Sequence, residues 1–415
     1  MQTEQMLTHG ATRLPSRFRE NEPRARRLAR PLLRFGGIGP EIDESLMARI
    51  GAALMQRDEP GAALADAIRM RVDGPARVTQ QQLRAAMRSG IAGVEACPPA
   101  LAEFMAVVSH VPDWVDWELI DQGASVLRRM GPNGRDVLEQ LALVGGYRFG
   151  GPGDLLVATG GLTGGRTLRR LAETQHWTVT LAEPGSLRPG TESWRLTVYV
   201  RAMHALVNST YESKWDVDRW GLPINQADQL GTLGLFSGTL LLGCRMLGVP
   251  ISQSDAHAFM HMWKYVGWLM GVDPSFLTDD EHEAHRLAYH VLLAAPNVSD
   301  AGPLLAQSVH VAIGERRFDR WPAGLQQLRG RLERERFLSM LNGFVGVEGM
   351  RELDLPRRLP WALALVVMQN VIRYRVIDRL HGGPDRRERI GREVALALVA
   401  SYFAGEQADV GDLPG

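Results

Sequence analysis

A histidine within an apolar helical stripe is the residue whose type and position most directly suggest chemistry. His204 lies in RLTVYVRAMHALVNSTY, where Val200, His204, Val207 and Tyr211 recur at steps of four, three and four. This spacing places the four side chains on one face of an α-helix. A buried imidazole on such a face is hydrogen-bonded in the core, titrates, or binds a ligand. The spacing alone leaves these interpretations open.

A second segment, GLTGGRTLRRLAETQHW, carries polar residues at helical spacing. Thr163, Thr167, Arg170, Thr174 and Trp177 follow one another at steps of four, three, four and three. Arginine and threonine side chains that face inward are costly unless they meet an anion, a polar ligand or water. The stripe is therefore either part of a binding site or an ordinary solvated helix face.

Helical periodicity covers most of the chain and predicts an all-α fold. Alternating strand patterns do not recur, and only TVTLAEPGSL is compatible with a short hairpin. We expect a single helical domain wrapped around a central bundle. The main predicted helices are Leu168–Trp177, Arg195–Tyr211, Gln226–Leu247, Asp255–Met270, Glu281–Leu293, Pro303–Ile313, Leu325–Leu341, Leu359–Asp378 and Arg387–Phe403.

The domain organisation follows from composition. Residues 1–40 form an arginine-rich arm, 41–405 the helical domain and 406–415 a short tail. Lys plus Arg equals Asp plus Glu at 47 each, so the chain has no net positive charge that would favour the binding of nucleic acid. The RARRLARPLLRF segment lacks the apolar core of an export signal, and no apolar run is long enough for a transmembrane segment. With only 2 cysteines, a cytoplasmic protein is expected.

Several motifs around His204 resemble a known enzyme family. VRAMHALV, KWDVDRWGLPINQADQLGTLGLFSGTLLLGCRMLG and HAFMHMWKYVGWLMGVDP are similar to segments of the latex-clearing-protein (rubber oxygenase) and fungal MpaB-type oxygenase superfamily. The resemblance runs over about residues 145–274. It implies a globin-like haem-binding core with additional peripheral helices, haem b as cofactor and dioxygen as co-substrate. The implied activity is a haem-dependent oxygenase acting on a small apolar substrate, such as an alkene, isoprenoid or lipid.

The resemblance also assigns residues. It places the proximal haem ligand at His204 and the distal arginine and threonine at Arg170 and Thr174, both within the stripe found by periodicity. The nearest match to the family's acidic catalytic residue is Asp154. Rubber-cleaving members carry lysine immediately before the distal threonine, where this chain has Glu173. That departure, together with the absent export signal, argues against rubber as the substrate.

Two other classes of function remain open. One is a non-catalytic haem-binding or lipid-binding helical protein. The other is a non-haem metalloenzyme, because histidine and glutamate recur on two predicted helices. HEAH has its second histidine one position too close for an HExxH zinc motif, and DDEHE is typical of the first turn of a helix. The residues concerned are His257, His261, Glu281, His282, Glu283, His285 and His290.

Overall fold

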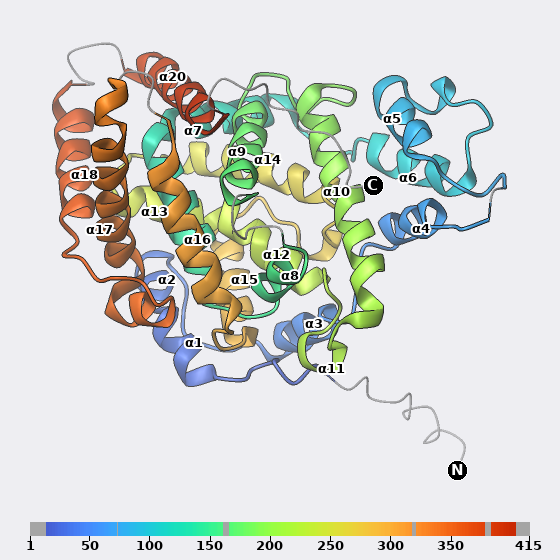
Figure 1. Cartoon of the computed structure of the whole chain (residues 1–415), viewed down its shortest axis with the longest axis horizontal. Helices are drawn as coiled ribbons and strands as arrows, with labels where there is room; N and C mark the ends of the chain where they lie inside the picture. The colour runs from blue at the N-terminus through green and yellow to red at the C-terminus, as the bar shows by residue number, and fades with distance from the viewer. Residues whose placement is uncertain (1–13, 73, 161–165, 318–320, 378–382, 404–415) are drawn as a thin grey trace.

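The computed structural model describes residues 14–72, 74–160, 166–317, 321–377 and 383–403, and in these ranges it is helical without any strand (Figure 1). The all-α prediction is confirmed. The first helices are α1 (Glu22–Leu28), α2 (Arg30–Phe35), α3 (Glu44–Ala53), α4 (Glu59–Ile68), α5 (Gln80–Ser89), α6 (Pro99–Ser109), α7 (Trp117–Asp136), α8 (Pro152–Ala158), α9 (Arg166–Leu181) and α10 (Glu192–Tyr211). The later ones are α11 (Val217–Trp220), α12 (Gln226–Phe236), α13 (Gly238–Met246), α14 (Gln253–Leu269), α15 (Glu281–Ala294), α16 (Ala301–Glu315), α17 (Gln326–Glu352), α18 (Trp361–Ile372) and α20 (Gly383–Phe403).

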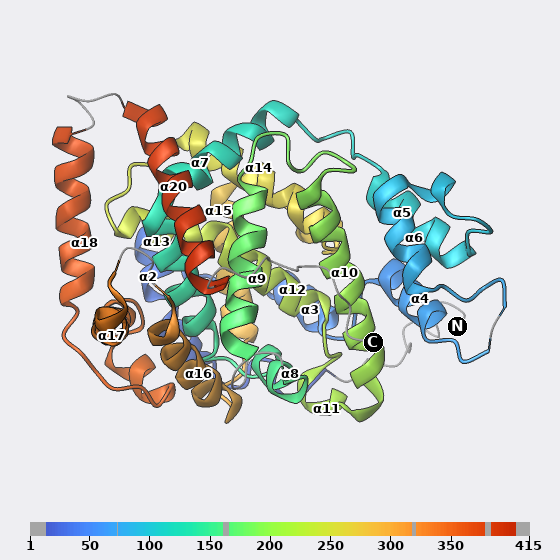
Figure 2. The same cartoon turned by 45° about the horizontal axis from the view of Figure 1, so that its top comes forward.

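The helices surround a central apolar core to which α14 contributes most of its length. Phe259, Trp263 and Tyr265 of α14 are almost completely buried. Helix α7 packs along α14 and also contacts α20, while α4 packs on α10. Figure 1 shows α17 and α18 along one side of the molecule and α4–α6 at the opposite side. The helices that matter for function, α9 and α10, lie between these two sides (Figure 2).

The crossing of α7 and α14 depends on one glycine. A Cβ atom at Gly123 would lie 2.5 Å from the carbonyl oxygen of Ala258 and 2.8 Å from the Cβ of Met262. We expect Gly123→Ala to lower the free energy of unfolding by about 1–3 kcal/mol, because the two helices must move apart. Gly234→Ala is the control, since no atom lies within 4 Å of a Cβ there. In the control, helix propensity alone predicts a gain of about 0.5–1 kcal/mol. Urea denaturation compares the two, and equal stability would contradict the close packing.

One predicted helix is interrupted in the structure. The sequence predicts a single helix over 226–247, but it divides at Ser237, whose φ and ψ of −107° and −98° are not helical. A Cβ at Gly238 would lie 3.3 Å from the ring of His285, so this glycine admits the close approach of α15. The PINQ segment predicts a turn with Asn225 as the helix cap, and the structure confirms it, because the Asn225 side chain accepts a hydrogen bond from the Asp228 N–H. The prediction of a short hairpin in TVTLAEPGSL is wrong, because α9 continues to Leu181 and is followed by turns.

The arginine-rich segment from residue 14 onward folds onto the body of the protein. Helices α1 and α2 contact α15, and Ala25 and Ala29 are buried. Arg17 and Arg24 are also buried, each against a carboxylate from a distant part of the chain: Arg17 pairs with Asp228 at 2.7 Å and Arg24 with Glu352 at 2.8 Å. Within the described ranges, no helix has both the length and the apolar character needed to cross a bilayer.

Candidate functional site

Helix α10 holds His204 through the packing of its other face. Trp194, Val198 and Ala202 are buried against the core. Arg201, three residues before His204, reaches Asp58 before α4 with two hydrogen bonds of 2.7 Å each. Farther along the stripe that contains His204, the hydroxyl of Tyr211 donates to the carbonyl of Ala158 at 3.0 Å. These contacts anchor the helix that carries His204.

The imidazole of His204 has no hydrogen-bond partner among the described residues. Its Nδ1 is enclosed and unpartnered, although the residue as a whole is only half-buried. Burial first, and then the positive charge of Arg170, lower the pKa of His204 from 6.5 to about 4, while Asp58 opposes the shift. The ring is consequently neutral at neutral pH and keeps a free lone pair.

Helix α9 brings the predicted polar stripe to the same region. The Nε1 of Trp177 donates to the hydroxyl of Thr197 on α10 at 3.0 Å, which joins the two helices. In Figure 2, α9 and α10 lie next to each other in front of α12. Arg170 acts electrostatically on His204, so the structure brings these two predicted residues together. Thr163 of the stripe lies outside the described residues.

The side chains of α9 are arranged around Arg170. Glu173 accepts from Nη1 of Arg170 at 3.1 Å and from Nε of Arg169 at 3.1 Å. Glu173 thus holds the Arg170 guanidinium in place. The hydroxyl of Thr174 donates to the carbonyl of Arg170 at 3.1 Å, and Thr174 is otherwise exposed to open space. Both predicted distal residues therefore keep donor or acceptor capacity for a ligand.

A large apolar cavity adjoins α9. Its volume is about 470 Å³, and Leu171, Thr174 and Thr178 of α9 form part of its wall. The resemblance to the oxygenase superfamily predicts apolar walls that include Leu171, Val200, Val207, Leu235, Phe236 and Leu240. Leu171, Leu235 and Phe236 line the cavity, whereas Val200, Val207 and Leu240 do not. His204 and Arg170 are not among the residues that line it. This volume is typical of sites for small molecules.

Glu139 and Asp154, two of the acidic residues at or beside this cavity, differ in their environments. The Asp154 carboxylate accepts hydrogen bonds from the Gly151 N–H and the Ser299 hydroxyl, both at 2.8 Å, and it does not line the cavity. Glu139, in a π-helical segment after α7, is buried, lines the cavity, and has an unpartnered Oε1. The sequence analysis missed Glu139, because a glutamate in an apolar helical run carries no motif.

The histidines of α14 and α15 have structural partners. His261 accepts from the Asp116 N–H at 3.0 Å and contacts Asp279, and both ring nitrogens of His285 lie against backbone carbonyls. His290 accepts from the Asp43 N–H at 2.9 Å and donates to a carbonyl. Over the described ranges, no three His, Cys, Asp or Glu side chains are grouped so as to hold a metal ion.

The depressed pKa of His204 predicts a measurable pH dependence. Since the pKa is about 4 in the folded protein, against 6.5 for an unperturbed histidine, the unfolded chain binds more protons between these values. With no ligand bound at His204, the free energy of unfolding should therefore fall as the pH drops below 6.5 and level off near 4. The loss is up to about 3 kcal/mol. His204→Leu should flatten this part of the profile in urea denaturation, and identical acid profiles would contradict the assignment.

Comparison with protein families supports the resemblance noted in the sequence. The family model described as ER-bound oxygenase mpaB/B'/Rubber oxygenase, catalytic domain, matches residues 135–398. This range contains α8, α9 and α10, and hence Asp154, Arg170, Thr174 and His204.

Two individual proteins are similar to this chain. The rubber oxygenase of Streptomyces sp. (strain K30) is 23% identical over 207 residues, which are 47% of this chain and 48% of that protein. The chain thus spans about half the length of the curated relative it matches. The structure of latex clearing protein LCP in the closed state superposes with a TM-score of 0.59 at 19% identity, covering 88% of this chain and 94% of the other. The second comparison establishes a common fold.

Proposed function

This chain belongs to the family of the ER-bound oxygenase mpaB/B' and rubber oxygenase catalytic domains, and from that premise we propose that it is a haem b-dependent oxygenase. Its substrates are dioxygen and an apolar alkene, isoprenoid or lipid-like molecule. His204 would hold the haem iron, and Arg170 and Thr174 would be the polar groups on the neighbouring helix α9.

The observation that carries this proposal is the state of His204. A ligating imidazole must be neutral and must keep one nitrogen free of hydrogen bonds. His204 meets both conditions, since its pKa is lowered to about 4 and no described residue is hydrogen-bonded to its ring. The buried His261, His285 and His290 use their ring nitrogens within the protein. The residues present therefore fit a haem held from α10.

The other residues of the candidate site have separate roles in this proposal. Haem, when bound, supplies an iron with which dioxygen can react. Arg170 and Thr174 donate hydrogen bonds toward developing negative charge, and Glu173 keeps the Arg170 guanidinium in place. Leu171, Leu235 and Phe236 bind the apolar substrate and exclude water.

Two carboxylates are candidates for handling a proton. Asp154 is the residue that the family resemblance indicates. Its Oδ2 is engaged by Gly151 and Ser299, so it is less available to a substrate. Glu139 has an unpartnered oxygen and lines the cavity. We propose that Glu139 shares or takes this role, because a proton acceptor must reach the substrate.

The test is an absorption spectrum of the purified full chain with its pyridine haemochrome, followed by oxygen uptake. We expect a Soret band, a b-type haemochrome, and oxygen consumption that depends on an unsaturated lipid or isoprenoid. A colourless protein from haem-replete cells would contradict the proposal. Haem without oxygen uptake over a broad substrate panel would favour the alternative that the apolar cavity supports, a non-catalytic haem-binding or lipid-binding protein.

A further inference from the structure

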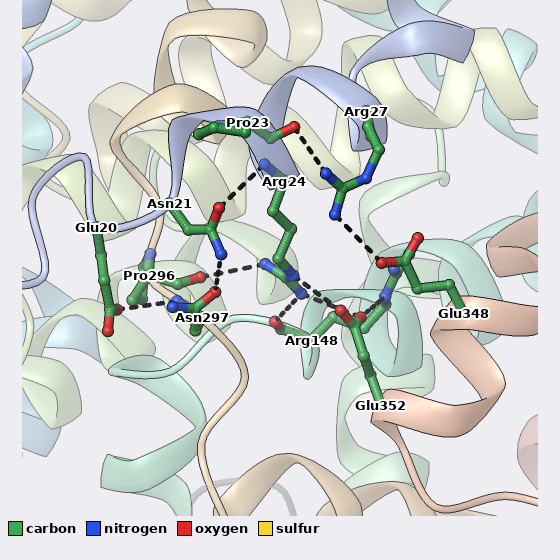
Figure 3. Close-up of polar contacts among 10 residues, drawn as sticks. All are labelled: Glu20, Asn21, Pro23, Arg24, Arg27, Arg148, Pro296, Asn297, Glu348 and Glu352. Atoms are coloured by element: carbon green, nitrogen blue, oxygen red, sulfur yellow. Dashed lines mark hydrogen bonds and ion pairs between the residues drawn. The ribbon is translucent and has the colours of Figure 1, made fainter.

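A buried cluster of two arginines and one glutamate lies beside the apolar cavity (Figure 3). Glu352 at the end of α17 accepts from Nε of Arg24 at 2.8 Å and from Nε of Arg148 at 2.6 Å. Arg24 also donates to the carbonyls of Arg148 and Pro296. Arg24 and Arg148 are 6% and 7% exposed, so both guanidinium groups are largely removed from water.

The cluster carries one unbalanced positive charge. Two arginines share the single carboxylate of Glu352, and the neighbouring acids are already engaged: Glu348 pairs with Arg27 and Glu20 with Arg219. A buried cation without a full counter-charge is costly. An anion bound here would therefore be stabilised by the unpaired positive charge. A site in which every arginine has its own carboxylate would not provide this stabilisation.

Two other positively charged residues that line the cavity are in ion pairs. Arg17 pairs with Asp228, and Lys264 pairs with Asp279. Glu139 lies close to Arg135. Burial lowers the pKa of the Arg135 guanidinium, but the negative charges of Asp136 and Glu139 raise it above its usual value. The surplus charge in the cavity wall is consequently located at the end formed by Arg148.

One nitrogen of Arg148 is free to bind that anion. Its Nη2 is buried and has no hydrogen-bond partner in the part of the chain that the structure describes, whereas Nε donates to Glu352. Arg148 forms part of the cavity wall together with Phe149, Pro296 and Val345, and Thr174 belongs to the wall of the same cavity. An elongated apolar molecule could thus contact Arg148 with one end and α9 with the other.

We propose that Arg148 binds the carboxylate of a long-chain substrate, so that the apolar tail extends along the cavity toward Thr174. The assignment of this ligand as a substrate rests on the proposed function, but the binding itself does not require haem. The substrate class is thereby an unsaturated fatty acid or another apolar chain that ends in a carboxylate. A neutral hydrocarbon would leave Nη2 unpaired. Charge-assisted hydrogen bonds to a carboxylate are among the stronger polar contacts in proteins.

The same chemistry could come from a second source, a propionate group of the porphyrin. The two sources differ in what Arg148 controls. If Arg148 binds a substrate carboxylate, replacing it lowers the affinity for fatty acids and leaves haem content unchanged. If Arg148 binds a propionate, replacing it lowers haem retention. Both quantities are therefore measured on the same variants.

The experiment titrates the purified full chain with dodecanoate and 1-dodecanol at a pH of about 8, where the free carboxylate is ionised. Displacement of the neutral dye Nile red reports binding. We expect dodecanoate to bind about tenfold or more tightly than dodecanol. Arg148→Met should reduce dodecanoate affinity to that of the alcohol while leaving dodecanol binding within about threefold of the unaltered chain.

The variants separate charge from folding. Arg148→Met leaves Glu352 paired with Arg24, so no buried carboxylate is orphaned. Arg148→Lys keeps the charge and should retain part of the preference. Arg27→Met removes an exposed arginine that pairs with Glu348 and should have no effect. His204→Ala should keep the preference, because binding at Arg148 is independent of haem.

Three results would overturn the inference: equal affinity for dodecanoate and dodecanol, an undiminished preference in Arg148→Met, or loss of haem in that variant without loss of fatty-acid binding. Any of these leaves the oxygenase proposal intact if the Soret band and oxygen uptake are present. Conversely, a colourless protein that prefers dodecanoate would overturn the proposed function and keep the carboxylate site.

Discussion

His204→Ala should abolish the Soret band and substrate-dependent oxygen uptake. The imidazole is neutral, has no hydrogen-bond partner among the described residues, and has its pKa lowered in part by Arg170. Loss of an outer-shell partner of a ligand typically costs about 10–100-fold in affinity or activity, so loss of the ligand itself should exceed this. Haem content by pyridine haemochrome and oxygen consumption are the measurements.

A control separates loss of the ligand from loss of the fold. His176→Ala removes an imidazole from α9 that lies 3.8 Å from Glu192, and it should keep both haem and activity. Free imidazole should restore Soret absorption in His204→Gly, because a small ligand can occupy the space that the side chain leaves. Retention of a full Soret band in His204→Ala would exclude His204 as the axial ligand.

The elements that carry the site follow from local sequence periodicity. The predicted helix over 195–211 corresponds to α10, and the polar stripe to α9, because the spacing of apolar and polar residues fixes a helix and its faces without long-range information. The same reasoning fails at Ser237. There, the approach of His285 to Gly238 determines where the helix ends, and the two residues are far apart in the chain.

Partners of buried charges were beyond sequence reasoning for the same physical cause. Arg201 shares the helical neighbourhood of His204, yet its guanidinium is bound by Asp58, which precedes it by 143 residues. Arg148 and Glu352 are separated by 204 residues. In an arginine-rich sequence, an arginine that is buried and paired in the fold cannot be distinguished from one that is exposed to solvent. The sequence therefore indicated His204 and the Arg170 stripe, but not Glu139 or the charge at Arg148.

Asp58→Ala should be the most destabilising single change among the residues that position α10. The Arg201 side chain is 4% exposed and that of Asp58 is 11% exposed, and their two hydrogen bonds are 2.7 Å each. Without Asp58, the hydrogen bonds that the guanidinium keeps among the described residues are those to the carbonyls of Trp268 and Leu269, both at 3.5 Å, besides its contact with the Phe104 ring. Breaking a buried pair by removing one partner costs about 3–5 kcal/mol. Urea denaturation should register this loss as a lower midpoint.

The double variant distinguishes an orphaned charge from damage to α4. Asp58→Ala combined with Arg201→Met removes both charges and should recover most of the lost stability, because no buried guanidinium remains unpaired. Glu59→Ala, at a neighbouring carboxylate that is 74% exposed, should change stability by less than about 1 kcal/mol. If Asp58→Ala proved as mild as Glu59→Ala, the pair would not be what holds α10, and with it His204, against the core.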